Sequence, residues 1–145
     1  MAPADDPSVP PLRLRIPTDA RLRETVRLIS KRVAAYVGYP EVEAVRIGQS
    51  VDEAVGTMMA CAGARDPGDS IDLRFSTSGG SMEIRLRYQA GESPLTGLDL
   101  ERGFGRSRNG GPAIEAIRTV MDRVEFGQDG NVAYCRLLLH LPLDA

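Results

Sequence analysis

The stretch IDLRFSTSGGSMEIRLRY, residues 71–88, decides the fold class of this chain. Apolar side chains alternate with polar or charged ones on both sides of a Ser-Gly-Gly-Ser turn at 78–81. A period of two places the apolar side chains of a strand on one face, and a glycine-containing turn joins two such strands as neighbours. The pattern therefore predicts an antiparallel hairpin with one dry face and one charged face.

Upstream of this hairpin the sequence predicts one strand and two helices. Leucine or isoleucine alternates with arginine over 12–16, which indicates a short strand. Apolar residues recur at spacings of three and four over 18–38, and this helix can be capped by Thr18 or Asp19. A second apolar stripe predicts a helix over about 41–62.

Downstream of the hairpin, the glycine-rich segment 89–111 lacks periodicity, so we expect a loop that serves as a lid, as a binding segment or as a disordered stretch. A third helix is predicted over about 112–121 and a second hairpin over 124–141, whose last strand is central because it is apolar on both faces. This order of elements indicates an α+β fold: a two-layer sandwich in which a mostly antiparallel sheet carries about three helices on one face.

The composition is that of an ordinary globular domain. The chain has 145 residues, of which 42% are hydrophobic and 26% charged. Residues 1–10 are rich in proline and aspartate and are expected to form a disordered leader, and 11–145 are expected to form a single domain. The formal net charge of -2 disfavours general nucleic-acid binding, and no apolar run is long enough to span a membrane. The isolated cysteines and the single histidine suggest no metal site, and we expect a cytoplasmic protein.

Two features could carry chemistry. Glu53, in the second predicted helix, can be read as a general base or as a solvated helix carboxylate. Gly110 and Gly111 precede the third predicted helix, where backbone N–H groups can bind phosphate, although a Gly-Gly pair can equally be a hinge. Neither feature decides a function by itself.

Short motifs in a fixed order narrow the choice. DEAVGT at 52–57 holds a Glu and, four residues later, a Thr; QAG at 89–91 closes the first hairpin; GGPAI at 110–114 leads into a helix that ends in Met-Asp at 121–122. In order and spacing these motifs resemble the GHKL ATPase family and, within it, the small anti-sigma-factor serine kinases of bacterial partner-switching systems. The resemblance covers nearly the whole chain after residue 10.

The departures from the family pattern concern the nucleotide site. In the family an Asn ligates Mg²⁺ where this chain has Thr57, and an Asp accepts the adenine amino group where it has Gln89. Ala113 replaces the second glycine of the phosphate loop, and Pro112 beside it has no N–H to donate. The resemblance thus implies that Glu53 keeps the position of the family's catalytic base as a vestige. The degenerate nucleotide site that it implies comprises Thr57, Gln89, Gly91, Gly110 and Gly111. We expect no cofactor, and ATP with Mg²⁺ only if the kinase alternative below holds.

The resemblance also implies protein partners: a sigma factor and a STAS-domain anti-anti-sigma factor, with a homodimer left open and with no nucleic-acid or membrane partner. Arg27 falls at the helix-one arginine that such proteins use for both partners, although it can also be one of several solvated helix cations. Arg23 on the same helix and Arg106 in the basic segment 102–108 complete the candidate partner-binding residues.

Three hypotheses follow. In the first, the protein is an anti-sigma-factor-like regulator of transcription in a stress response, a pseudokinase that sequesters a sigma factor and is released by its STAS-domain antagonist. In the second, it is an active serine kinase of that antagonist, with Glu53 as base. In the third, it is an α+β protein-binding domain unrelated to sigma regulation, and its GHKL likeness is convergent.

Overall fold

The fold is built on one antiparallel sheet of five strands, described by a computed structural model that covers residues 11–62, 68–91, 94–106 and 111–142. The strands are β1 (Leu12–Pro17), β2 (Ser70–Ser78), β3 (Ser81–Gln89), β4 (Arg123–Asp129) and β5 (Val132–His140). They lie in the order β1-β2-β3-β5-β4, so β1 and β4 are the edges. The predicted inner position of the last strand is confirmed.

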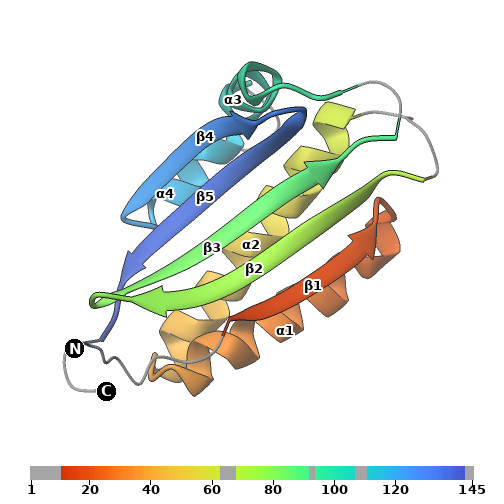
Figure 1. Cartoon of the computed structure of the whole chain (residues 1–145). Coiled ribbons are helices and arrows are strands. Elements are labelled where there is room, and N and C mark those ends of the chain that lie inside the picture. Colours follow the sequence, from red (N-terminus) through yellow and green to blue (C-terminus); the bar gives the residue numbers. More distant parts are fainter. Residues whose placement is uncertain (1–10, 63–67, 92–93, 107–110, 143–145) are drawn as a thin grey trace, which may run out of the picture.

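Helices cover one face of this sheet, and the other face carries none of the described elements (Figure 1). They are the 3-10 turn Ala20–Leu22 and the α-helices α1 (Arg23–Tyr36), α2 (Glu41–Ala62), α3 (Gly97–Gly105) and α4 (Ala113–Arg118). The α+β two-layer architecture is therefore confirmed. The described residues form four α-helices, where the sequence predicts about three.

The hydrophobic core lies between the sheet and α2. The side chains of β2 and β3 alternate between buried and partly exposed, as period two requires. The inward residues of this hairpin are almost fully buried, and they are Ile71, Leu73, Phe75, Met82, Ile84, Leu86 and Tyr88. The turn between the two strands uses Gly79 and Gly80, both with positive φ angles that favour glycine. The predicted hairpin is thus confirmed.

The segment expected to be a loop, 89–111, contains a helix. Thr96 accepts a hydrogen bond from the backbone N of Asp99, and the Asp99 side chain accepts one from the backbone N of Thr96, which forms a capping box at the start of α3. Leu100 and Phe104 are buried, and the ring of Phe104 meets that of Phe126 edge-on at 5.0 Å. The glycines of this segment obscure the pattern because glycine has a low helix propensity.

The third predicted helix is shorter than expected. α4 ends at Arg118, not near residue 121, and the Thr119 hydroxyl donates to the carbonyl of Ala116. None of the helices found in the described ranges is both long and apolar enough to cross a lipid bilayer.

Candidate functional site

Glu53 and Thr57 lie one turn apart on α2, and their side chains have different surroundings. The Thr57 hydroxyl donates a hydrogen bond of 2.8 Å to the backbone carbonyl of Glu53, and only 2% of the residue is exposed. This is the local back-bonding that threonine often makes within a helix. The hydroxyl is therefore engaged with the backbone of α2 and is shielded from solvent.

Glu53 lines a cleft of about 240 Å³ between α2 and α4. The other lining residues are Arg46, Gln49, Ser50, Ala116, Ile117, Thr119 and Val120. A carboxylate at the wall of a cleft can act as a base toward a bound hydroxyl. Glu53 thus borders a cleft beside α4, the helix that follows the glycine pair, and its role as a base stays a prediction.

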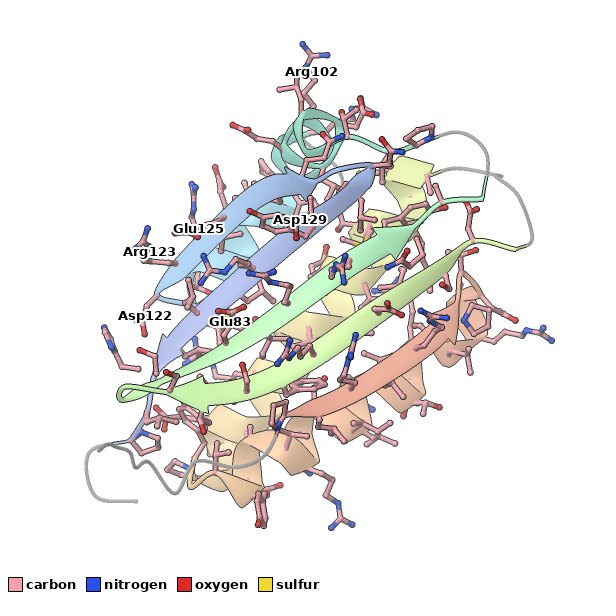
Figure 2. All side chains as sticks on the ribbon, viewed as in Figure 1. Glu83, Arg102, Asp122, Arg123, Glu125 and Asp129 are labelled. Carbon is pink, nitrogen blue, oxygen red and sulfur yellow. The ribbon has the colours of Figure 1, made fainter. Side chains whose placement is uncertain are left out.

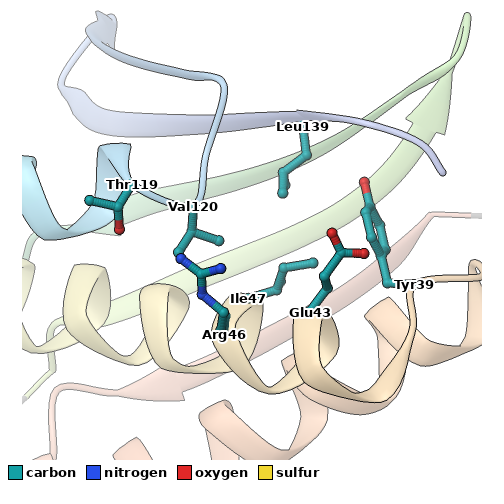
Figure 3. A pocket seen from close by; sticks show the side chains of 7 residues that line it. All are labelled: Tyr39, Glu43, Arg46, Ile47, Thr119, Val120 and Leu139. Carbon is teal, nitrogen blue, oxygen red and sulfur yellow. The ribbon is translucent and has the colours of Figure 1, made fainter.

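A second cleft, of about 150 Å³, continues along α2 from the first, because Arg46, Thr119 and Val120 line both. Figure 3 shows Arg46 and Glu43 rising from α2 toward Val120 and Leu139, with the ring of Tyr39 closing the far end. The Tyr39 hydroxyl donates to the carbonyl of His140 at 2.5 Å. Burial of this phenol, together with the negative charges of Asp122 and Glu43, raises its pKa to about 12. We call the two clefts together the α2–α4 groove.

Gln89 lies on the opposite face of the sheet. Alternation along β3 buries Tyr88 and turns Gln89 outward, where its Nε2 donates to Oδ2 of Asp72 at 3.2 Å. An adenine contact by Gln89 would require a position of this side chain other than the one seen. The helix-facing residue at this end of β3 is Tyr88, whose side chain is buried in the core.

A buried carboxylate that the sequence analysis did not identify organises this end of the hairpin. Asp69, with 2% of its surface exposed, accepts a hydrogen bond from the Tyr88 hydroxyl and one of 2.6 Å from the backbone N of Gly91. Gly91 thus donates its N–H within the fold, where a buried carboxylate needs such partners. The only sequence signal was an aspartate directly before a strong strand pattern.

The start of α4 offers little to an anion. Gly110 lies outside the described residues, and Gly111 has a φ of 98°, which glycine adopts without strain. Pro112 is the N-cap residue, has no side-chain cap bond and has no N–H, and Ala113 is 5% exposed. The helix itself has only six residues, so its dipole is weak.

These positions do not fit ATP with Mg²⁺. The Thr57 hydroxyl is back-bonded to its helix, Gln89 is on the outer face of the sheet, and Pro112 removes a donor. Across the described ranges, no three or more histidine, cysteine, aspartate or glutamate side chains come together as a metal site. The nucleotide roles assigned from the sequence stay predictions.

Of the candidate partner-binding residues, two lie together and one lies apart. Arg23 and Arg27 are both on α1 and partly exposed: Arg23 is held by Asp52 at 2.7 Å and Arg27 by Glu24 at 2.7 Å. Arg106, at the end of α3, instead lines a cleft of about 280 Å³ between α2 and α3, together with Arg102 and Cys61. The three arginines therefore do not form one cluster.

Comparisons with known proteins agree with this fold. The model of the family described as "Histidine kinase-like ATPase domain" matches residues 16–137. No curated protein matches this sequence.

Among solved structures, the crystal structure of the RsbU and RsbW domains of Rv1364c from Mycobacterium tuberculosis has a similar fold, with a TM-score of 0.64 and 15% sequence identity. The match covers 92% of this chain and 32% of that chain, so this chain spans about a third of its length. At this identity the likeness concerns the fold alone. Since the family model matches most of the sequence, and the sheet with its helices on one face agrees with it, the chain belongs to the histidine kinase-like ATPase domains, the GHKL fold to which its motifs pointed.

Proposed function

We propose that this protein is a partner-switching regulator that binds a sigma factor and a STAS-domain antagonist in turn and phosphorylates neither. The family to which it belongs and the motif resemblance to anti-sigma serine kinases support this. So does the shared fold with a structure named for RsbU and RsbW domains. The proposed mechanism is occlusion: two partners that use one surface exclude each other, so the concentration of the antagonist sets how much sigma factor is free.

The observation that carries the proposal is an exposed stripe on α1. Leu28, Arg32 and Tyr36 follow each other at a spacing of four, which places them on one side of the helix. Leu28 is 46% exposed and Tyr36 is 75% exposed, although both are large apolar side chains. Tyrosine and arginine are enriched among the residues that dominate protein interfaces, and the exposed leucine adds apolar surface beside them. We call these three residues the α1 stripe.

The absence of kinase activity is the second part of the proposal. Phosphoryl transfer depends on holding the metal and the phosphates in position. The Thr57 hydroxyl is bonded to the Glu53 carbonyl at 2.8 Å, and Pro112 has no N–H at the start of α4. Both features support weak nucleotide binding or none, and a base at Glu53 would then have no phosphate to act on.

Binding measurements with matched variants test the partner surface. We expect one sigma factor and one STAS-domain protein of the source organism to bind in calorimetry and to displace each other. Leu28→Glu should weaken both affinities at least about tenfold, because it places a charge in an apolar contact. Leu98→Glu is the matched control, since Leu98 on α3 is 54% exposed and lies off the α1 stripe. Full affinity in the Leu28→Glu protein would contradict the proposal.

Arg27 is tested in the same way. Its guanidinium is already paired with Glu24, so charge reversal in Arg27→Glu removes one cation and places two carboxylates close together. We expect capture of both partners to weaken by about 2 kcal/mol if Arg27 is in the interface. An unchanged affinity would remove Arg27 from the partner surface and leave the α1 stripe in place.

One observation favours the kinase alternative: Glu53 lines the α2–α4 groove and is accessible there. Titration of the protein with ATP and Mg²⁺ separates the two functions. Under the proposal, no binding is detected up to about millimolar ATP, and Glu53→Gln leaves capture of both partners unchanged. Two results together would establish the kinase instead. These are micromolar ATP binding, and transfer of phosphate to a serine of the STAS-domain protein that is lost in the Glu53→Gln variant.

A further inference from the structure

The outer face of the sheet carries a row of arginines that the proposed function does not use. The strand register places Arg13 opposite Arg74, Arg74 opposite Arg85, and Arg85 opposite Arg136, across four neighbouring strands. Strands lie about 4.8 Å apart, and like charges directly opposite each other destabilise a sheet. A row of this kind needs anions to balance it.

On one half of this face the anions come from the chain itself. Glu83, Glu125 and Asp129 lie over the β3-β5-β4 half, where Figure 2 labels them. Glu83 lies 3.2 Å from Arg85 and 2.8 Å from Arg136, and Glu125 lies 2.6 Å from Arg136. Arg85, Arg123 and Arg136 each lie within 4.0 Å of at least one of these carboxylates, so this group of charges is balanced. Arg87, the other outward arginine of β3, lies in register with Asp72 on β2 and is counted with the β1-β2 side.

The other half is not balanced. Arg13, Arg15, Arg74 and Arg87 face outward there with one carboxylate in register, Asp72, and we call these four residues the basic corner. Arg15 pairs with Asp72 at 2.8 Å, with 14% of the Asp72 side chain exposed. Within the described part of the chain, Arg13 and Arg74 have no carboxylate within 4.0 Å. Among the described residues the buried Nε of Arg87 has no hydrogen-bond acceptor, which is also true of the Nε of Arg136 on β5.

Protection of the sheet edge does not explain this corner. Charged side chains on an edge strand prevent pairing with other chains, which accounts for Arg13 on β1. Arg74, however, lies on the inner strand β2 with an arginine opposite it on each side. Unpaired like charges at an inner position lower stability and give nothing to the isolated chain, whereas they are useful when a partner supplies the anions.

We propose that the basic corner binds an acidic segment of a partner polypeptide. The planar guanidinium binds a carboxylate by donating two parallel hydrogen bonds, and among the described residues no carboxylate lies within reach of Arg13 or Arg74. The corner extends over three strands, about 10 Å, which suits a few neighbouring carboxylates. This inference concerns the face of the sheet away from α1, so it goes beyond the proposed function and does not rest on it (Figure 1).

Two other occupants fit less well. A nucleic-acid strand carries phosphates continuously, and beyond the corner these would meet Glu83, Glu125 and Asp129 on a chain of net charge -2. A second copy of this chain, packed face to face, would offer the corner only the balanced half or another basic corner. The charge pattern therefore favours an acidic protein segment.

The test uses a fluorescein-labelled peptide of eight Glu-Ser repeats, with a Gln-Ser peptide of equal length as the uncharged control. We expect the full chain to bind the acidic peptide in fluorescence anisotropy, more weakly as salt is raised, and to leave the Gln-Ser peptide unbound. The double variant Arg13→Gln/Arg74→Gln should bind at least about tenfold more weakly. Its thermal midpoint should equal or exceed that of the unaltered chain, because a like-charge contact is removed.

A second double variant, Arg102→Gln/Arg118→Gln, removes the same charge from exposed helix positions away from this face of the sheet and should bind within about twofold of the unaltered chain. Three results would overturn the proposal. The first is an equal loss in both double variants, which indicates general charge attraction. The second is tighter, corner-dependent binding of a single-stranded DNA with eight phosphates. The third is self-association of the unaltered chain that Arg13→Gln/Arg74→Gln abolishes.

Discussion

The two long sides of α2 differ in how they pack. Toward α1, a Cβ added at Gly48 would lie 2.7 Å from the backbone oxygen of Arg27, and one added at Gly56 would lie 2.4 Å from the guanidinium carbon of Arg23. Toward α4, the same helix lines clefts of about 240 and 150 Å³. We call the α1–α2 interface, where the helices are in direct contact at these glycines, the closed seam or closed side. We call the α2–α4 interface, which contains the clefts, the hollow side.

This difference corresponds to the two roles considered for the protein, which are binding of a partner by α1 and chemistry in the cleft beside α4. Close contact at glycine fixes α1 on α2, so the α1 stripe is presented on a rigid support, which lowers the entropy lost on binding. On the other side of α2, the longer polar side chains of Arg46 and Gln49 line the groove, which stays open between α2 and α4. Glu53, the residue at the position of the family's base, lies on the hollow side, and the proposed partner surface lies on the closed side.

The largest effect is expected at Gly48. The added methyl group of Gly48→Ala would meet backbone, which cannot turn aside as a side chain can, so we expect a loss of about 2–3 kcal/mol in the free energy of unfolding. Urea unfolding measures it, and partner capture should fall with it if α1 moves. Gly105→Ala is the control, because a Cβ there meets nothing within 4 Å. A more stable Gly48→Ala protein, as helix propensity alone predicts, would show that the seam is not closed.

A substitution of Tyr39, which lines one end of the α2–α4 groove, tests the hollow side. Tyr39→Phe removes the hydrogen bond to the His140 carbonyl and should cost about 1 kcal/mol at neutral pH. Because the folded chain raises the pKa of this phenol from 10.0 to about 12, its contribution is complete below pH 10 and is lost as the pH rises toward 12. Unfolding measured from pH 8 to 12 should therefore show a flatter alkaline limb in Tyr39→Phe. Identical limbs in both proteins would refute this assignment.

The ion pair between α1 and α2 is expected to add less. Arg23 Nε lies 2.7 Å from Asp52 Oδ1, and the two side chains are 38% and 26% exposed. A double-mutant cycle with Arg23→Ala and Asp52→Ala should give a coupling energy of about 0.5–1 kcal/mol, reduced by salt. A coupling of zero would mean that this ion pair adds nothing to the packing of α1 on α2.

The smallest effect is expected where the groove has room. Ala116 is exposed and lines the 240 Å³ cleft, so the larger side chain of Ala116→Leu can enter it without displacing backbone. We expect the free energy of unfolding to change by less than about 0.5 kcal/mol. A loss as large as that of Gly48→Ala would show that the α1–α2 and α2–α4 interfaces are equally tightly packed, which would contradict the difference described above.

Local patterns in the sequence were sufficient for much of the fold. The alternation over 71–88 predicts β2 and β3, and the stripe over 41–62 predicts α2 with the bounds that the structure has. The helix α3 was missed, although Thr96 and Asp99 form a recognisable capping box. Its glycines become intelligible only in three dimensions: a Cβ at Gly97 would lie 2.7 Å from the Gly127 carbonyl oxygen, and one at Gly103 would lie 2.1 Å from Cys61 Sγ.

The candidate site was predicted less completely. Glu53 was predicted to lie on a helix, which the structure confirms, because helical spacing is a local property. That this helix borders a cleft at Glu53 is a finding of the structure. The outward position of Gln89, by contrast, depends on the register of β3 within the sheet, since a shift of one residue exchanges the two faces of a strand. Asp69 was not identified at all, because its partners Tyr88 and Gly91 are about 20 residues away in sequence.

Periodicity, capping and turn residues specified the helices and strands of this protein, because each acts over a few neighbouring residues. The arrangement that matters for function was decided by packing over long sequence distances: a glycine pressed against another helix, a threonine shielded by burial, and arginines from four strands brought into one row. Contacts of this kind depend on which surfaces the assembled layers bring together, and no local pattern encodes that.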